Sequence, residues 1–413
     1  MDDPDSGIVG QLMKKDRIAR EKKLHAKAVA NPKDSVTSTS EVASDEAVAE
    51  PGVHEEGGGP GSKGEVGTTL EEPKKTKVFW YIGTKTYVQR GLEKCAEALG
   101  LSSPNQFRHY DTPMMKGERP EEDQSELLDQ GAHTVYQQIL GIGIWLVICG
   151  RYDIAYAINV MSKFNAAPRR GLLERVIRIL GYLRKHPSLW IKIDSSDPGI
   201  VPGEDPHIFG KISEMKELYP DVKEDIDPNF PQPKGKEMAT TIFFDAGLGD
   251  QATQGRGHSG ILTFVGRTPV ACVSKRQSTA EASTYGAEFI AGRLAAEEAL
   301  TIRYALRSFG VPVTRPTKFY GDNLGMLQSS GNASAQIKKR HLSTAFHFVR
   351  EQVASGVVQP VKVHTNDNVA DTLTKPLDAT LFRKHNEVLF QKPDEPELAR
   401  DLKRLKIWYP SSA

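Results

Sequence analysis

The sequence is poor in the features that mark secreted, membrane-spanning and zinc-binding proteins. Its three cysteines, Cys95, Cys149 and Cys272, lie far apart and lack metal-ligand spacing, so we expect neither a disulfide scaffold nor a zinc site. The most apolar stretch, residues 139–149, is too short to span a bilayer, and the N-terminus lacks the basic-then-apolar layout of a secretory signal. We therefore expect an intracellular protein, cytoplasmic or nuclear, without a membrane partner.

Net charge is nearly absent as well. The 413 residues include 54 basic and 53 acidic side chains, which gives a formal net charge of +1. This balance excludes a global positive field, so any contact with nucleic acid must come from local basic patches. The length is sufficient for two or three domains, but only 38% of residues are hydrophobic, so part of the chain is expected to lie outside a packed core.

Composition and periodicity divide the chain into five parts. Residues 1–76 combine a basic helix, expected within 8–27, with a Gly-, Ser-, Glu- and Pro-rich segment that we expect to be disordered. Residues 77–193 predict a short strand and then a helical subdomain, with helices near 133–149, 153–164 and 170–185 and a strand at 189–193. We expect an acidic, Pro-rich linker over 194–238, a second domain over 239–390 and a C-terminal tail over 391–413.

The second domain has the pattern of an α/β fold. Strands are expected at 240–244, 258–265, 268–274, 317–320 and 357–364. The capping-box sequence from Ser278 to Glu281 predicts the start of a long helix, and Gly310 with Pro312 predicts its end. Shorter helices are expected from 323, over 342–355 and from about 368. This order of elements implies a mixed sheet flanked by helices.

Four acidic residues of this domain stand where an acid adds little to stability. Asp245 and Asp322 each follow an apolar strand, and ligands tend to bind at the carboxyl ends of strands in open sheets. Glu288 is expected well inside the long helix, ten residues after Ser278, and Asp371 in the first turn of the last helix. Each acid alone has a structural explanation, as a turn, helix-start or solvated residue. Together, converging carboxylates would repel one another unless cations neutralised them, and oxygen ligands suit Mg²⁺ or Mn²⁺.

Several segments of this domain resemble the ribonuclease H domain of copia-type LTR retrotransposon Pol polyproteins. They are residues 243–246, 274–277, 283–289, 320–323, 340–341, 347–351 and 368–377, and the last of them, which ends in Leu-Thr-Lys-Pro-Leu, is especially characteristic. The resemblance extends upstream, where residues 136–141, 151–157 and 178–183 look like the connection between reverse transcriptase and ribonuclease H. The catalytic Asp-Asp strand of the polymerase palm has no counterpart.

The resemblance implies a ribonuclease H-like mixed five-stranded sheet and hydrolysis of the RNA strand of RNA–DNA hybrids. Asp245, Glu288, Asp322 and Asp371 would hold two Mg²⁺ or Mn²⁺ ions, and a pair of such ions is the usual device for cleaving phosphodiesters. His364, after the last strand, is a candidate for assisting product release. Five basic residues are candidates for backbone contacts with nucleic acid: Lys275, Arg276, Lys338, Lys339 and Arg340.

Two other functions stay open at this level. The chain also fits a catalytically inactive remnant that binds nucleic acid, because the polymerase palm is missing. Alternatively, it fits the non-polymerase subunit of a split reverse transcriptase, in which its apolar helices would dock on a palm-bearing polypeptide.

Overall fold

The computed structural model of the chain describes residue 8 and residues 79–248 and 256–393. The expected disordered segment, the expected basic helix apart from Ile8, and the expected C-terminal tail apart from 391–393 lie outside these residues. None of the helices in the described ranges is both long and apolar enough to cross a membrane.

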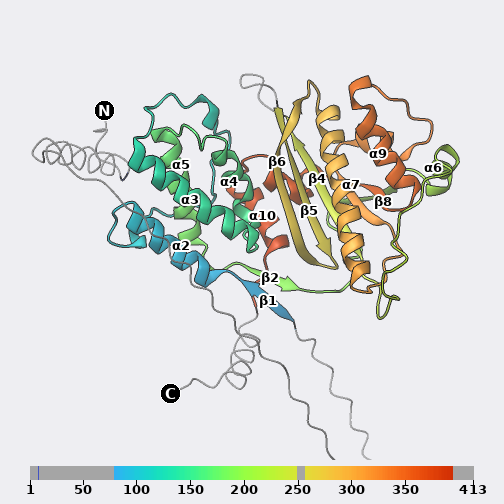
Figure 1. Cartoon of the computed structure of the whole chain (residues 1–413), viewed down its shortest axis with the longest axis horizontal. Helices are drawn as coiled ribbons and strands as arrows, with labels where there is room; N and C mark the ends of the chain where they lie inside the picture. The colour runs from blue at the N-terminus through green and yellow to red at the C-terminus, as the bar shows by residue number, and fades with distance from the viewer. Residues whose placement is uncertain (1–7, 9–78, 249–255, 394–413) are drawn as a thin grey trace, which may run out of the picture. The chain divides into compact units, whose positions relative to one another are not determined.

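The first part of the described chain is a helical unit with a small two-stranded sheet (Figure 1). Its strands β1 (Trp80–Gly83) and β2 (Trp190–Ile193) pair antiparallel. Between them lie η1 (Pro104–Gln106), η2 (Pro120–Glu122), η3 (Tyr152–Ile154) and the helices α2 (Lys85–Ala98), α3 (Gln130–Ile148), α4 (Ala155–Ser162) and α5 (Arg170–Lys185). The expected helical subdomain is thus present, and α5 has the bounds that its periodicity predicted.

The second part is built on a six-stranded mixed sheet in the order β3-β8-β7-β4-β5-β6. The strands β4, β5 and β6 are antiparallel neighbours, whereas β7 and β8 run parallel to β4. Their bounds are β3 (Glu204–Ile208), β4 (Thr240–Gly247), β5 (Arg256–Val265), β6 (Thr268–Ala280), β7 (Thr317–Gly321) and β8 (Val358–Val363). All five strands expected within 239–390 are present, and the expected fold class, a mixed sheet flanked by helices, is confirmed.

The sixth strand comes from the segment expected to be a linker. β3 pairs antiparallel with β8, and α6 (Ile212–Leu218) packs on α9 (Ser343–Ala354). Two apolar side chains, Phe209 and Met215, anchor this segment in the core. β3 also covers the edge of β8, which would otherwise expose unpaired backbone groups. The acidic, Pro-rich composition of 194–238 therefore did not predict its role as part of the domain.

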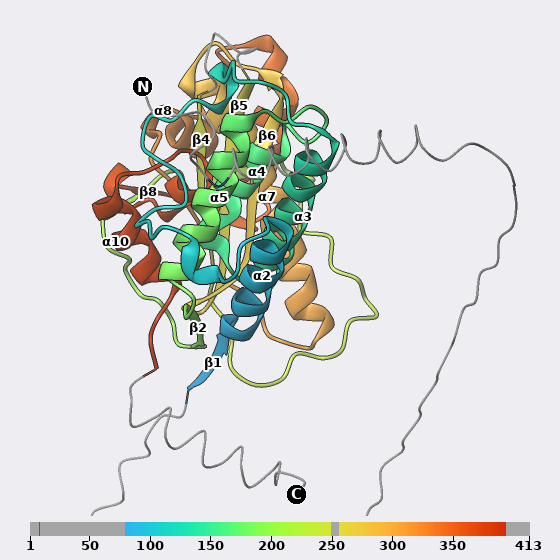
Figure 2. The same ribbon diagram turned by 90° about the vertical axis from the view of Figure 1, so that its left-hand side faces the viewer.

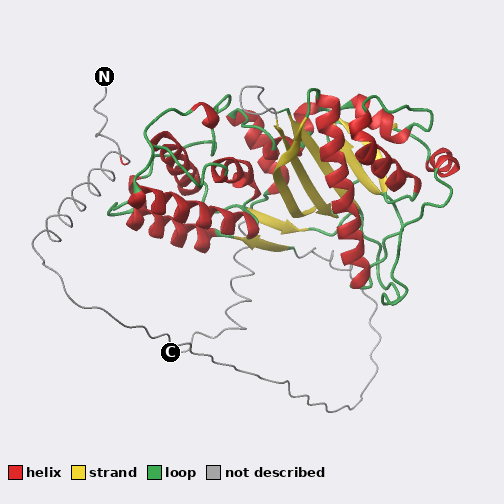
Figure 3. Cartoon of the chain, turned by 45° about the horizontal axis from the view of Figure 1, so that its top comes forward, coloured by secondary structure: helices red, strands yellow, loops and turns green. Residues whose placement is uncertain are grey.

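Helices cover both faces of the sheet (Figures 2 and 3). On one face, α7 (Thr284–Ser308) packs against β4 and β5, together with α8 (Leu324–Gly331) and α9. Alanines at four-residue steps let α7 approach the sheet closely, and all are fully buried: Ala287, Ala291, Ala295 and Ala299. On the other face lie η7 (Val369–Leu373) and α4, and α10 (Ala379–Leu389) packs on η7 and buries Phe382 in the core of the helical unit. The end of the domain thereby joins the two parts.

The long helix begins later than its capping-box sequence predicted. β6 continues to pair with β5 as far as Ala280, so the expected cap, Ser278, lies in a strand. The helix starts at Thr284, and the Ser283 hydroxyl accepts a hydrogen bond from the Gly286 backbone N–H (3.3 Å). Glu288 is therefore the fifth residue of the helix and lies close to its N-terminus.

A buried cluster of ion pairs joins residues 194–238, the segment expected to be a linker, to α7. The Glu224 carboxylate accepts hydrogen bonds from Arg303 Nε (2.8 Å) and Arg307 Nη2 (2.8 Å). Burial alone would raise the Glu224 pKa, but the two guanidinium groups lower it to about 2. The Arg303 side chain is only 2% exposed, so its charge depends on Glu224 for compensation.

Glu224→Ala is expected to lower the free energy of unfolding by about 3–5 kcal/mol, because Arg303 would remain buried without a carboxylate. The matched control is Glu297→Ala, which breaks an exposed pair with Arg293 on the same helix and should cost about 0.5 kcal/mol or less. Urea unfolding measures both. The depressed Glu224 pKa means that its contribution should be lost as pH falls from about 4.5 towards 2. If Glu224→Ala and Glu297→Ala lower the free energy of unfolding equally, the result would contradict this account.

Candidate metal centre

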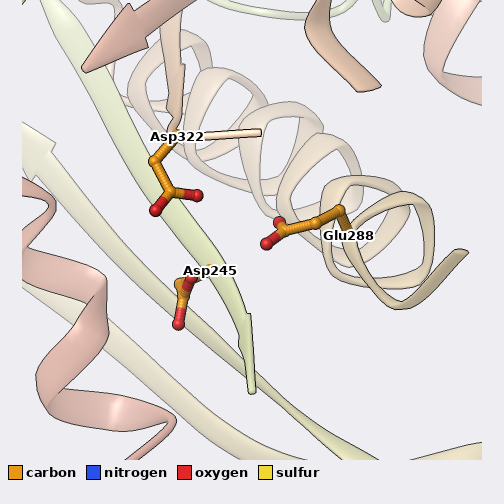
Figure 4. A group of neighbouring side chains, drawn as sticks. All are labelled: Asp245, Glu288 and Asp322. Carbon is orange, nitrogen blue, oxygen red and sulfur yellow. The ribbon is translucent and has the colours of Figure 1, made fainter. Parts of the chain in front are cut away.

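Three of the four predicted acids converge at one edge of the sheet. Asp245 ends the apolar part of β4, Asp322 follows β7, and Glu288 reaches in from α7, with the three carboxylates directed towards one another (Figure 4). One oxygen from each lies within 4.8 Å of the others. The parallel pairing of β4 and β7 brings Asp245 and Asp322 together, since parallel strands end at the same edge.

Close packing behind the acids fixes these positions. Gly321, directly before Asp322, lies against the Phe244 ring, and a Cβ at Gly321 would come within 2.6 Å of that ring. Phe244 also packs on Phe319 of β7, with ring centroids 4.3 Å apart. Any side chain at position 321 would therefore push β4 and β7 apart and separate the carboxylates that follow.

The electrostatics of the three acids are unfavourable in the absence of a cation. Burial raises the Glu288 pKa well above its usual range, and Asp245 and Asp322 raise it further. Burial and Asp245 also raise the Asp322 pKa, although a hydrogen bond with Thr365 acts against the shift. Glu288 is 4% exposed, and among the described residues no hydrogen-bond partner meets its Oε2. A buried acceptor without a partner is costly unless a ligand satisfies it.

The fourth predicted acid, Asp371, lies beside this group but is held by a lysine. Lys375 Nζ is 2.9 Å from Asp371 Oδ1 and 3.9 Å from Asp245 Oδ2. Burial and the nearby Asp245 raise the Asp371 pKa, and Lys375 partly offsets the shift. Thr374 donates a hydrogen bond to Asp245. Neither Thr374 nor Lys375 was predicted as a site residue; their place in the Leu-Thr-Lys-Pro-Leu segment was the available signal.

The other predicted site residues lie around the acids rather than among them. His364 is exposed and accepts a hydrogen bond from the Asn366 backbone N–H (3.2 Å), next to Thr365, the hydrogen-bond partner of Asp322. Lys339 donates to Ser283 at the start of α7 (2.7 Å), and the Lys338 ammonium lies 4.9 Å from the centroid of the Tyr285 ring. Lys275 and Arg340 are exposed, and Arg276 is half-buried on β6.

The donor set fits a hard divalent cation. The converging groups in the described part of the chain are carboxylates only, without a thiol or imidazole among them. Oxygen ligands of this type suit Mg²⁺ and Mn²⁺, and a cation would satisfy the unpartnered Glu288 oxygen and offset the mutual repulsion. Asp245, Glu288 and Asp322 are therefore the residues that would hold a metal ion, with Asp371 within reach of Asp245.

Fold and site together define a mixed α/β domain with a buried carboxylate centre, joined to a helical unit. The sequence is similar to the retrovirus-related Pol polyproteins from transposons RE1 and RE2 of Arabidopsis thaliana, with 28% and 26% identity over 250 residues. It is also 25% identical over 258 residues to the Pol polyprotein from transposon TNT 1-94 of Nicotiana tabacum. The homologues are thus copia-type retrotransposon Pol polyproteins, as the motifs indicated.

The similarity covers most of this chain but little of these relatives. The matches span 60% of the chain for the first two and 62% for the third, and only 14%, 14% and 16% of the relatives' own lengths. No family model matches the chain. Among solved structures, the chain is similar to RNase H1 from the halophilic archaeon Halobacterium salinarum NRC-1, with a TM-score of 0.26 and 19% identity over 33% of this chain and 94% of that one.

The raised carboxylate pKa values predict how stability depends on pH and magnesium. With raised pKa values for Glu288, Asp322 and Asp371, the folded chain binds more protons than the unfolded chain, so metal-free stability should fall as pH rises above about 4.5. Mg²⁺ should stabilise by about 2.7 kcal/mol at 100 times its Kd. The gain should be larger at higher pH, because the ligands must be deprotonated.

Thermal unfolding with and without Mg²⁺ across this pH range tests the prediction. Glu288→Gln should flatten the pH dependence and weaken the magnesium effect, whereas Glu297→Gln on the same helix should change neither. If millimolar Mg²⁺ does not change the midpoint temperature of unfolding at the highest pH tested, the result would contradict a metal centre here.

Proposed function

We propose that residues 239–390 form a ribonuclease H-like domain that hydrolyses the RNA strand of RNA–DNA hybrids with two bound Mg²⁺ or Mn²⁺ ions. The observation that carries this proposal is the convergence of Asp245, Glu288 and Asp322 within 4.8 Å at the edge of a mixed sheet. The similarity to retrotransposon Pol polyproteins supports it, because reverse transcription produces such hybrids and the motifs around these acids resemble those of the family's ribonuclease H domain.

Asp245 is the central ligand in this proposal. It lies close enough to Glu288, Asp322 and Asp371 to raise the pKa of each, so it would hold a divalent ion together with its neighbours. When bound, a pair of divalent ions activates a water molecule for attack on a phosphodiester and stabilises the charge on the departing oxygen. Thr374 orients the Asp245 carboxylate through its hydrogen bond, and Thr365 does the same for Asp322.

Lys375 has a positioning role. Burial would lower its pKa, but Asp245 and Asp371 raise it, so its ammonium group keeps its proton. The ammonium holds Asp371 next to Asp245 and offsets part of the repulsion between the two carboxylates. For Asp371 to serve as a metal ligand, its oxygens must be shared between Lys375 and the ion.

Asp245→Asn and Asp322→Asn should each reduce cleavage of a labelled RNA–DNA hybrid by roughly a hundredfold or more, the scale on which loss of one electrostatic contact slows an enzyme. Neither variant should lose stability, because each removes one of several repelling charges. Cleavage is measured with and without Mg²⁺ on hybrid, duplex DNA and duplex RNA. Glu297→Gln is the matched control, and activity at its level in either aspartate variant would refute the proposal.

A second function is favoured by an exposed apolar surface on the helical unit. Three residues on one side of α3 are exposed, Ile144 (46%), Trp145 (54%) and Ile148 (68%), as are Trp80 (74%) and Ile82 (53%) of β1. Exposed apolar residues gathered on one element are typical of a protein–protein interface. This surface would suit the non-polymerase subunit of a split reverse transcriptase, docked on a palm-bearing polypeptide.

Co-expression with such a polypeptide tests this second function. We expect the two chains to co-purify, and we expect Trp145→Ser with Ile148→Ser to abolish the complex without unfolding the chain. Tyr304→Ser, at an exposed aromatic residue of α7, is the control.

A catalytically inactive nucleic-acid-binding remnant would instead bind hybrid and show no heat of Mg²⁺ binding by calorimetry.

A further inference from the structure

A cavity of about 510 Å³ lies between the sheet and α10, on the face of the sheet opposite α7. Its floor is formed by Thr241 and Phe243 of β4 and by Phe264 of β5, which pairs with Thr241 in the sheet. The walls come from η7, α10 and the segment before β3, which contribute Val369, His385, Val388, Ile200 and Val201. We name it the β4–α10 cavity. Its volume is in the range of sites that bind small molecules.

Two buried polar side chains that line this cavity each have an atom without a hydrogen-bond partner. Thr241 is 2% exposed and His385 is 1% exposed, and neither Thr241 Oγ1 nor His385 Nε2 meets a partner among the described residues. Buried polar atoms are normally hydrogen-bonded, because an unpaired one loses its bonds to water without replacement. Since both residues line the same cavity, one ligand bound there could supply a partner to each.

The charges around the cavity favour a neutral ligand. The lining contains two cations, Arg267 and Lys384, and two anions, Asp367 and Glu387. Lys384 Nζ is 2.6 Å from Asp367 Oδ1, so these two charges compensate each other. Burial and then Lys384 lower the His385 pKa to about 4, although Asp367 acts against the shift, so the imidazole is neutral at physiological pH. A neutral imidazole ring has one nitrogen that donates a hydrogen bond and one that accepts.

The floor of the cavity favours a flat aromatic ring. The rings of Phe243 and Phe264 are buried and meet edge-on, with centroids 5.8 Å apart. Aromatic rings pack favourably on other aromatic rings in edge-on or offset arrangements. Ile200 and Val388, which also line the cavity, are 78% and 42% exposed, so apolar surface continues to its opening. A bound aromatic molecule would remove this surface from water.

The β4–α10 cavity is separate from the carboxylate centre, although the same elements build both. Of the residues that the structure describes around the cavity, none is one of the four acids. Phe243 lies two residues before Asp245, and Val369 lies two residues before Asp371. A ligand in the cavity would therefore contact the elements that position these acids without occupying the metal site.

We propose that the β4–α10 cavity binds a small, neutral, flat aromatic molecule that carries a hydrogen-bonding group. The ring of the ligand would lie against Phe243 and Phe264, and its polar group would pair with His385 Nε2 and the Thr241 hydroxyl. Nitrogen heteroaromatic compounds such as indole have this chemistry. The site does not depend on the proposed nuclease activity, because it shares no ligand residue with the metal centre.

NMR titration of the full chain with indole and with indene tests the site. Indene has the same two-ring shape as indole but lacks the N–H group. Indole should bind saturably and roughly fivefold more tightly than indene, the scale of one net hydrogen bond. Millimolar Mg²⁺ should leave indole binding unchanged, because the two sites are separate; displacement of indole by Mg²⁺ would contradict that separation.

Thr241→Val and His385→Phe remove the unpartnered atoms and keep side chains of similar size. In both variants, indole affinity should fall to that of indene, indene affinity should stay unchanged, and the midpoint temperature of unfolding should not fall. The matched control is Thr263→Val, which removes a buried, unpartnered hydroxyl on the α7 side of the sheet, where Thr263 pairs with Ile242. This control should change neither affinity.

Ile200→Ser tests the site even if the two buried substitutions unfold the chain. Ile200 is exposed, so its substitution should not affect folding, and it should weaken indole and indene binding by the same factor. The inference is overturned if indole does not bind saturably to the native chain. It is also overturned if Thr241→Val and His385→Phe, correctly folded, both bind indole as tightly as Thr263→Val does. Loss or absence of hybrid cleavage would not affect either result.

Discussion

Repulsion between buried carboxylates is the constraint on which the rest of this structure depends. Asp245, Glu288 and Asp322 lose hydration and face one another, so their charged forms are unstable without compensation. The fold does not relax this arrangement. The β4–β7 pairing, the Phe244–Phe319 contact and the absence of a side chain at Gly321 all hold the acids together. Such unfavourable electrostatics are typical of functional sites, where they can be offset by a bound ligand.

The elements around the acids offset part of this cost. Lys375 supplies a positive charge between Asp371 and Asp245, and the hydroxyls of Thr374 and Thr365 donate to Asp245 and Asp322. Two of these three residues come from the segment after η7, which also packs on the helical unit through Leu377. The same short segment thus supports the acids and connects the two parts of the described chain.

The segment between the two parts also stabilises the domain. Although acidic and Pro-rich, it adds β3 to the sheet edge and packs α6 on α9. Glu224 compensates two arginines of α7, the helix that carries Glu288. The position of one proposed metal ligand therefore depends on a helix that is held from its far end by residues distant in sequence.

The sequence by itself indicated the candidate acids, the mixed sheet and the bounds of α5. Apolar periodicity, and an acid that follows an apolar strand, can both be read from neighbouring residues. It misplaced the start of α7, since the pairing of β6 with β5 continued beyond the local capping signal at Ser278. Only the tertiary structure decided the pairing of Lys375 with Asp371 and the inclusion of β3 in the sheet. These features join residues far apart in the chain, and their energies depend on burial and distance, which no local pattern of residues specifies.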